Sequence, residues 1–262
     1  DARSLRQLRA MAAHPHGLLL ATGPTGSGKT TTLNALLREV ASERVKVITI
    51  EDPVEYRIGG VDQIQTNERI GLTFDSLLRR VLRQDPDVIM VGEIRDTPTA
   101  ELSLRAALTG HLVLSTLHTN DAVSVIPRLR DMGVEPYLLA AVLRGALAQR
   151  LVRTVCRACA RSGKPEARER ALLRDYGLTA TRLVRGSGCD ACDGTGFRGR
   201  TAVFELFASD ARIEEMILRG ERTAAFTDYL AAKGFRSLAR NGLALALKGV
   251  TTVAEVEKAV MG

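Results

Sequence analysis

The sequence predicts an α/β protein whose sheet is mostly parallel, and three observations lead to this prediction. Short apolar runs that suit buried strands alternate with stretches of helical spacing up to about residue 150. One of these runs, Leu18–Thr22, leads directly into a glycine-rich loop, and a helical stretch follows that loop. Strand–helix alternation of this kind favours a parallel sheet that is covered by helices on both faces.

The expected elements follow in order along this first part of the chain. Strands are predicted at Leu18–Thr22, Val45–Ile50, Val88–Val91 and Leu112–Thr116, and helices at Thr31–Val40 and Phe74–Arg83. In the second helix, Phe74 and the apolar residues after it recur at i, i+3, i+4, i+7 and i+8. This spacing places them on one helical face.

The sequence changes character after Leu151. Residues 153–200 are rich in Gly, Arg and Cys, and helical spacing resumes near Ser209. Thr252 and Glu255 stand in capping-box register before an apolar stripe, which predicts the start of a helix. We therefore expect a phosphate-loop domain at 1–150, a cysteine-bearing subdomain at 151–205 and a small helical subdomain at 206–262.

Composition and charge narrow the class of protein. Hydrophobic residues make up 45% of the 262 residues, which is ordinary for a packed globular protein. No apolar run reaches the roughly 18 to 20 residues that a membrane span needs, and no signal peptide is visible, so we expect a cytosolic protein or a cytosolic fragment. The net charge of +7 permits a nucleotide, nucleic acid or acidic lipid as partner and selects none of them.

The loop GPTGSGKT matches the phosphate-binding pattern G-x-x-x-x-G-K-[ST] and stands between a strand and a helix, as that pattern requires. Its glycines let successive N–H groups turn toward phosphate oxygens, and the helix N-terminus adds partial positive charge. We expect Lys29 to contact the β and γ phosphates and the Thr30 hydroxyl to bind Mg²⁺. The expected nucleotide-binding residues are Gly23, Pro24, Thr25, Gly26, Ser27, Gly28, Lys29 and Thr30.

Acidic residues follow two of the predicted strands. Glu51, Asp52 and Glu55 follow the second strand, and Gly92 and Glu93 follow the third. Because parallel strands direct their carboxyl ends to the ligand side of the sheet, these carboxylates are expected near the metal. A metal-supporting Asp often ends the third strand; Gly92 stands there, so this role falls on the Glu51–Glu55 segment. Glu93 is the expected group that polarises the attacking water; helix capping or pairing with arginines is the alternative for these acids.

Histidine and arginine residues extend the expected site. His118 follows the fourth strand, where a γ-phosphate sensor would stand, whereas His111 precedes that strand and suits a structural role. Arg79 and Arg83 lie four residues apart and share a helical face. They could complete the phosphate site of a neighbouring subunit, or form surface salt bridges.

Arg95 and Arg128 are further basic residues in a loop or at a helix start, and the same two roles are open to them.

Four cysteines form two C-x₂-C pairs with 29 residues between the pairs: Cys156 with Cys159, and Cys189 with Cys192. Two such knuckles can present four thiolates tetrahedrally to Zn²⁺. Four thiolates leave no open coordination position, so the metal would be structural. Free buried thiols and an iron–sulfur cluster are the alternatives.

Taken together, these motifs resemble the secretion and pilus-assembly ATPase superfamily, and within it the type II secretion ATPases, the general secretion pathway protein E group. The resemblance runs from the phosphate loop through ITIEDPVEY, QTNERIGLTFDSLLRRVLRQDPDVIMVGEIRD and GHLVLSTLHTNDA to LAQRLVRTVCRAC and CDACDGTGFRGRTAVFEL. One departure is Pro98, where the family usually carries an acid. Retraction ATPases of type IV pili lack the four cysteines, and pilus-extension ATPases have a longer loop between the pairs.

The resemblance implies a RecA-like ATPase domain, a tetracysteine zinc subdomain and a helical C-terminal subdomain. It implies ATP, Mg²⁺ and structural Zn²⁺, and a homo-oligomer, expected to be a hexamer, at the inner face of the cytoplasmic membrane. Its partners would be cytoplasmic domains of inner-membrane platform proteins, with an acidic phospholipid surface as a further partner and no specific nucleic acid. The expected function is ATP hydrolysis that drives pseudopilus assembly.

Three alternatives stay open at this point. They are a type IV pilus extension ATPase, a DNA-translocating RecA-like motor, and a nucleotide-gated scaffold with little hydrolysis. The resemblance also implies N-terminal domains that this chain lacks, so we expect the chain alone to bind nucleotide weakly and to hydrolyse it slowly.

Overall fold

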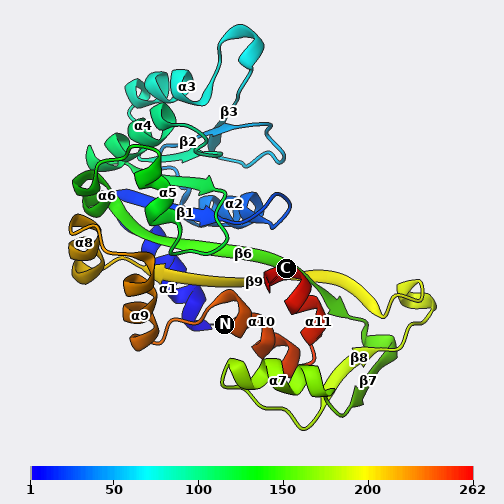
Figure 1. Ribbon diagram of the computed structural model, residues 1–262. Coiled ribbons are helices and arrows are strands. Elements are labelled where there is room, and N and C mark those ends of the chain that lie inside the picture. Colours follow the sequence, from blue (N-terminus) through cyan, green and yellow to red (C-terminus); the bar gives the residue numbers. More distant parts are fainter. Residues whose placement is uncertain (1, 262) are drawn as a thin grey trace. The chain divides into compact units, whose positions relative to one another are not determined.

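A seven-stranded sheet dominates the computed structural model, which describes residues 2–261 (Figure 1). The strands lie in the order β3-β2-β4-β5-β1-β6-β9. Their bounds are β1 (Gly17–Thr22), β2 (Val47–Glu51), β3 (Val61–Gln65), β4 (Val88–Val91), β5 (Leu112–Leu117), β6 (Leu143–Val155) and β9 (Phe197–Ala208). Strand β1 pairs in parallel with β5 and β6, β2 with β3 and β4, and β4 with β5. The predicted mostly parallel α/β sheet is therefore confirmed.

Strands β1, β2, β4 and β5 confirm the four predicted strands to within two residues at each end. Every residue of these four strands is buried, as their uninterrupted apolar runs require in a sheet covered on both faces. The sequence did not predict β3, β6 or β9. Strand β3 is a polar edge strand, VDQIQ, and β6 carries three arginines and a glutamine among its apolar residues.

One glycine permits the pairing at this side of the sheet. A Cβ atom on Gly145 of β6, whose φ is +158°, would lie 2.3 Å from the carbonyl oxygen of Phe207 in β9. Only a residue without a side chain allows the two backbones to approach this closely.

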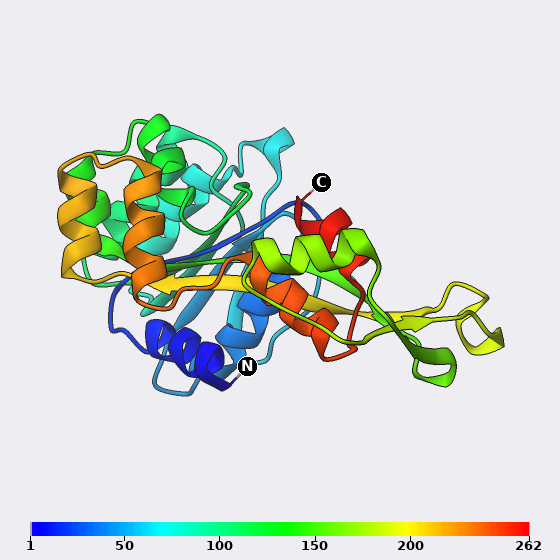
Figure 2. The ribbon, with the colours of Figure 1, turned by 60° about the horizontal axis from the view of Figure 1, so that its bottom comes forward.

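Helices cover both faces of the sheet. They are α1 (Ala2–Ala12), α2 (Lys29–Val40), α3 (Phe74–Val81), α4 (Thr97–Leu108), α5 (Val125–Asp131), α6 (Pro136–Val142), α8 (Ala211–Leu218) and α9 (Thr223–Ala232), with short turns η1 (Glu68–Ile70) and η2 (Leu82–Gln84). Figure 2 shows α1 and α2, in blue, on the face opposite to α3 and α4. Thr73 caps α3, because its hydroxyl accepts from the Ser76 N–H. The predicted helices at 31–40 and 74–83 are both present, the second ending in η2.

Packing divides the chain into two units. The first holds residues up to Pro24, Lys29–Ala148 and Leu206–Phe235, and the second holds Thr25–Gly28, Gln149–Glu205 and the residues from Arg236 on. The segment 206–235 thus packs with the large unit, although it lies within the expected helical subdomain. The division into 1–150, 151–205 and 206–262 stays a prediction.

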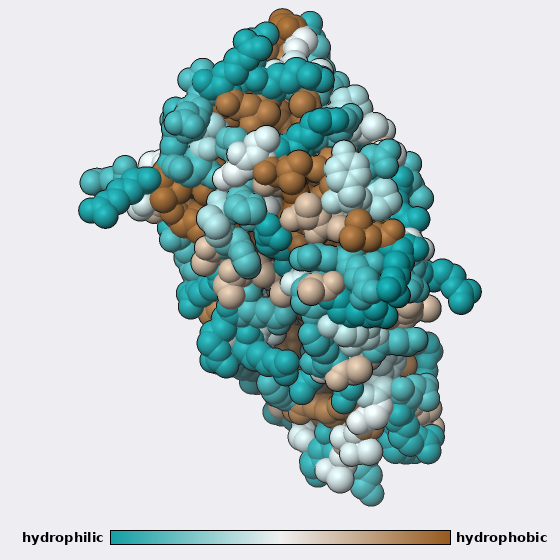
Figure 3. Space-filling view, turned by 90° about the vertical axis from the view of Figure 1, so that its left-hand side faces the viewer, coloured by the Kyte–Doolittle hydropathy of each residue, from teal (hydrophilic) through white to brown (hydrophobic). Residues whose placement is uncertain are grey.

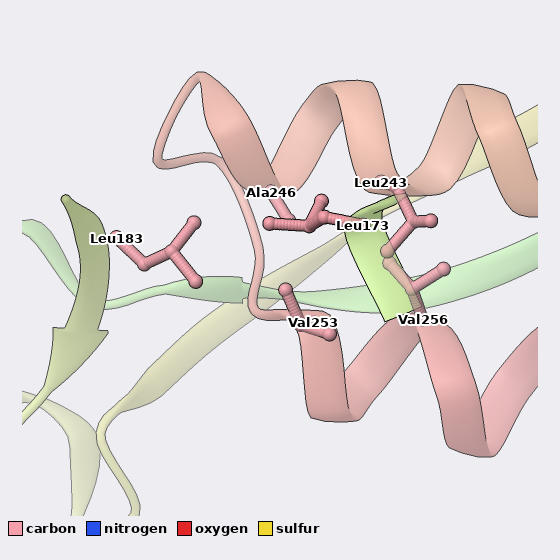
Figure 4. Close-up of a cluster of buried hydrophobic side chains, with 6 residues drawn as sticks. All are labelled: Leu173, Leu183, Leu243, Ala246, Val253 and Val256. Carbon is pink, nitrogen blue, oxygen red and sulfur yellow. The ribbon is translucent and has the colours of Figure 1, made fainter. Parts of the chain in front are cut away.

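The second unit has its own apolar core (Figure 4). Its remaining elements are β7 (Ala160–Gly163), β8 (Leu183–Gly186), α7 (Ala167–Asp175), α10 (Leu238–Leu247), α11 (Val253–Val256), η3 (Arg157–Cys159), η4 (Asp190–Cys192) and η5 (Glu257–Met261). The core side chains come from α7, β8, α10 and α11: Leu173, Leu183, Leu243, Ala246, Val253 and Val256. Strands β7 and β8 pair in antiparallel fashion.

The predicted cap at Thr252 is present, but the capping box is not closed. The Thr252 hydroxyl accepts from the Glu255 N–H at 3.2 Å, as the register predicted. The Glu255 carboxylate instead accepts from the guanidinium of Arg153, with 2.9 Å between Nε and Oε2. An ion pair with β6 therefore replaces the second half of the box.

The surface of the helices over the sheet mixes polar and apolar side chains (Figure 3). Leu108 of α4, Tyr137 of α6 and Leu218 of α8 are more than half exposed. Between residues 2 and 261, no helix combines the length and the apolar character that crossing a membrane requires.

Candidate functional site

The phosphate loop joins the end of β1 to the start of α2. Gly26 and Gly28 have φ of +75° and +86°, in the left-handed region that favours glycine. A Cβ atom on Gly26 would meet nothing within 4 Å, so strain and not crowding selects glycine there. At Gly28 a Cβ atom would lie 2.7 Å from the side-chain nitrogen of Gln149, so both constraints apply.

The polar groups of this loop fit a polyphosphate. The Lys29 ammonium donates to the carbonyl oxygens of Gly23 and Pro24, at 2.7 and 3.0 Å, and so stays within the loop. The Ser27 hydroxyl is buried and has no hydrogen-bond partner in the described part of the chain. Because a buried hydroxyl without a partner is costly, this atom indicates that a ligand completes its hydrogen bonding. Thr30 follows at the start of α2, half-buried.

Thr22, the last residue of β1, fixes the ends of two strands together. Its hydroxyl lies 3.0 Å from the Leu117 carbonyl oxygen and 2.8 Å from the Thr119 hydroxyl, and it accepts from the Thr119 N–H at 2.7 Å. The segment that carries His118 is thereby held beside the start of the phosphate loop. The sequence gave no signal for this role, since Thr22 reads as the last residue of an apolar strand.

Glu51 ends β2 as a buried carboxylate with a side-chain exposure of only 3%. Its Oε1 accepts from the Thr49 hydroxyl at 2.6 Å and from the Gln63 amide at 2.8 Å. Its Oε2 has no partner among the described residues. A buried, half-satisfied carboxylate oxygen at the ligand side of the sheet suits a cation or a water that a cation holds. Glu55 is exposed on the segment between β2 and β3, and the described residues offer it no ion pair.

Glu93 lies at the centre of a charged cluster after β4. The Arg95 guanidinium pairs with Glu93 Oε1, and His118 Nε2 lies 3.5 Å from Glu93 Oε2. Arg95 also reaches Asp52 at 3.5 Å. Burial raises the pKa of Glu93, but Arg95 and His118 together outweigh burial and hold that pKa below its usual value. The carboxylate is therefore ionised at neutral pH.

A cavity of about 540 Å³ lies beside this cluster, lined by Asp52, Arg95 and residues 65–69. Gly92 shapes the approach to it. A Cβ atom on Gly92 would lie 3.0 Å from the Ile50 carbonyl oxygen, so a side chain here would press against β2. Glycine in place of an Asp at this strand end thus has a steric reason.

The other predicted basic residues stand apart from the Glu93 cluster. Arg79 in α3 and Arg83 in η2 are exposed, and neither forms an ion pair within residues 2–261. Arg128 is exposed on α5. His111 Nδ1 lies 2.9 Å from the Ala106 carbonyl oxygen at the end of α4, which suits the structural role expected for it.

The four cysteines converge in the second unit. All four Sγ atoms lie within 4.8 Å of one another. Three of the sulfur–sulfur distances are 3.9, 3.8 and 3.7 Å. A tetrahedron of sulfurs about 2.3 Å from Zn²⁺ has edges of about 3.8 Å, so the cluster has the dimensions of a zinc site.

One of the four thiols is already biased toward the thiolate that a metal needs. Burial opposes ionisation of Cys192, but the N–H groups of Cys189 and Gly196 outweigh it and lower its pKa to about 7. The Gly196 nitrogen lies 3.2 Å from Cys192 Sγ. The cluster could therefore bind zinc through four sulfur ligands.

Comparison with known proteins gives relatives on both sides of the expected function. The chain is 47% identical over 252 residues to the type IV pilus assembly ATPase PilB of Thermus thermophilus, covering 95% of this chain and 28% of that protein. It is 46% identical over 248 residues to the type II secretion system ATPase E of Vibrio cholerae, covering 95% of this chain and 49% of that protein. The chain thus spans half or less of the length of these relatives.

The fold is also found among solved structures. The pilus retraction motor PilT, solved with bound ADP, aligns with a TM-score of 0.72 and 28% identity, covering 96% of this chain and 63% of that chain. The sheet and its helices are therefore those of a RecA-like ATPase. A family model described as type II/IV secretion system protein matches residues 1–258. The chain belongs to the type II/IV secretion system protein family.

Proposed function

We propose that this chain is an ATPase that powers protein secretion by driving pseudopilus assembly in a type II secretion system. The observation that carries the proposal is a row of four neighbouring strand ends. In the order β2-β4-β5-β1, these ends lead to Glu51, Glu93, His118 and the phosphate loop. All four strands are parallel, so the four groups lie along one edge of the sheet.

Phosphate binding falls to the loop and the start of α2. The Lys29 ammonium would leave the carbonyls of Gly23 and Pro24 for the β and γ phosphates, and the Thr30 hydroxyl would hold Mg²⁺. The unpartnered oxygens of Ser27 and Glu51 support this arrangement, since both are buried without a hydrogen bond. Bound Mg²⁺ would supply charge neutralisation at the β and γ phosphate oxygens.

Glu93 is the proposed group that orients the attacking water and accepts its proton. Its carboxylate is ionised, because Arg95 and His118 lower its pKa, and it lies two strands from the phosphate loop. His118, about half exposed, would sense the γ-phosphate from the intervening strand. Glu55 is proposed as a supporting acid only, since it is exposed on a loop.

Subunit assembly would complete the site. Exposed arginines that lack an ion pair within the described chain, Arg79 and Arg83, support a role as fingers toward the phosphates of a neighbouring copy. We propose a hexamer at the inner face of the cytoplasmic membrane, engaged with cytoplasmic domains of platform proteins and translocating its cargo indirectly. The name of the Vibrio cholerae relative supports the secretion assignment.

A type IV pilus extension ATPase is the second candidate. The relative named pilus assembly ATPase PilB is as similar to this chain as the secretion ATPases are. The short loop between the cysteine pairs favours secretion. A DNA-translocating motor has no comparable support from the relatives.

Replacing Glu93 tests the catalytic assignment. Glu93→Gln keeps the size of the side chain and removes its basicity, so ATP binding is expected to stay within about twofold while turnover falls about 100-fold or more. Equilibrium nucleotide binding and steady-state phosphate release measure the two quantities. Glu101→Gln, on the exposed face of α4, is the matched control and should retain turnover. Near-normal hydrolysis by Glu93→Gln removes Glu93 from the mechanism.

Replacing Arg95 tests what sets the ionisation of Glu93. Without the guanidinium, burial is the main remaining influence and raises the pKa of Glu93. Because turnover needs the ionised carboxylate, the acid limb of the pH–rate profile should move to higher pH by about half a unit or more in Arg95→Ala. Arg105→Ala, which breaks a surface pair with Glu101, should leave the limb in place. An unmoved acid limb in Arg95→Ala contradicts the assignment.

Metal analysis tests the cysteine cluster. We expect about one zinc per chain in the parent and close to none in the double variant Cys156→Ser with Cys189→Ser. Hydrogen exchange should rise around residues 150–205 in that variant, because the metal holds both knuckles. Iron with labile sulfide in the parent would identify a cluster instead, and a metal-free parent would leave four thiols.

A further inference from the structure

Gln149 of β6 makes a buried contact with the phosphate loop. Its side-chain nitrogen donates to the Ser27 carbonyl oxygen at 2.8 Å. Gln149 is 4% exposed and Ser27 is 2% exposed. Both residues belong to the second unit, in which Thr25–Gly28 pack together with Gln149–Glu205. The centre of the loop is therefore held by a side chain far away in sequence.

This hydrogen bond fixes the direction of a whole peptide group. A trans peptide is planar, and its carbonyl oxygen and N–H point in opposite directions. When Gln149 holds the Ser27 oxygen on one side of the loop, the N–H of Gly28 must point to the other side. Gly28 is the glycine before Lys29, and its N–H is one of those that the loop pattern directs at phosphate oxygens.

The same contact explains why position 28 is glycine. A Cβ atom there would lie 2.7 Å from Gln149 Nε2 and 3.8 Å from Leu151 Cδ2. A side chain at position 28 would thus displace the amide that holds Ser27. The left-handed φ of +86° is the conformation in which the loop reverses toward α2, and glycine adopts it without strain.

We propose that Gln149 is a positioning residue for nucleotide binding, which holds the Ser27–Gly28 peptide so that the Gly28 N–H faces the phosphates. This inference rests on the proposed function, because it assigns Gln149 to the nucleotide site of the ATPase. Gln149 does not contact the reacting atoms. It acts through the backbone of the loop, which without it would exchange between orientations of this peptide.

The test compares the parent with Gln149→Met, which keeps the length of the side chain and removes the donor. We expect the dissociation constant for a fluorescent ATP analogue with Mg²⁺ to rise about tenfold, as loss of one buried hydrogen bond and of loop order predicts. Gln149→Glu, whose carboxylate oxygens oppose the Ser27 carbonyl, should weaken binding further. Gln84→Met, at an exposed position in η2, should bind as the parent does.

Two further readouts separate positioning from damage to the fold. In the nucleotide-free chain, amide hydrogen exchange of residues 25–28 should accelerate in Gln149→Met while the core strands stay protected. In steady state, KM for ATP should rise with kcat nearly unchanged, since the N–H contacts ground and transition states alike. A partly unfolded preparation would instead lower kcat and leave KM unchanged.

Binding by Gln149→Met within twofold of the parent overturns the inference, as does unchanged exchange in the loop. If the parent binds and hydrolyses ATP normally in that case, the proposed function stands and only the role of Gln149 falls. If the parent binds no nucleotide, both fail together.

Discussion

The parallel register of the sheet is the constraint on which the candidate site depends. Ile50 pairs with Val91, Val91 with Ser115, and Ser115 with Leu20, so one row crosses β2, β4, β5 and β1. Each strand stops within two residues of this row, and each stop delivers one chemical group to the same edge. Acid, sensor and phosphate loop come from distant parts of the sequence, and backbone pairing alone aligns them.

Unsatisfied polar atoms mark where this edge expects a ligand. The side chains around the site are otherwise closely bonded, as Thr22 and Gln63 illustrate. The Ser27 hydroxyl and one oxygen of Glu51 are exceptions, since both are buried without a partner in the described chain. The same environment would suppress the charge of Glu93, and the nearby Arg95 prevents this. Burial thus prepares the site for a charged ligand while ion pairing keeps the base ionised.

The sequence predicted those features that have a local signal. Uninterrupted apolar runs located four central strands, the glycine pattern located the loop, and cysteine spacing located a cluster that the structure brings together. Features that depend on tertiary contact had no such signal. Strand β6 was missed because its arginines and Gln149 interrupt the apolar pattern, and the contact between Gln149 and Ser27 joins residues 122 apart in sequence. Arg95 was expected as a loop cation or a finger, but it pairs with Glu93 of the same chain.

The central claim is that the four strand ends form an ATPase site used in secretion. The most direct measurement is phosphate release from ATP at increasing concentration of this chain, with the cytoplasmic domain of a platform protein and acidic phospholipid, and separately with double-stranded DNA. The account predicts that the rate per chain rises with concentration and with the platform domain, and that DNA has no effect. Acceleration by DNA without any by the platform domain would contradict it.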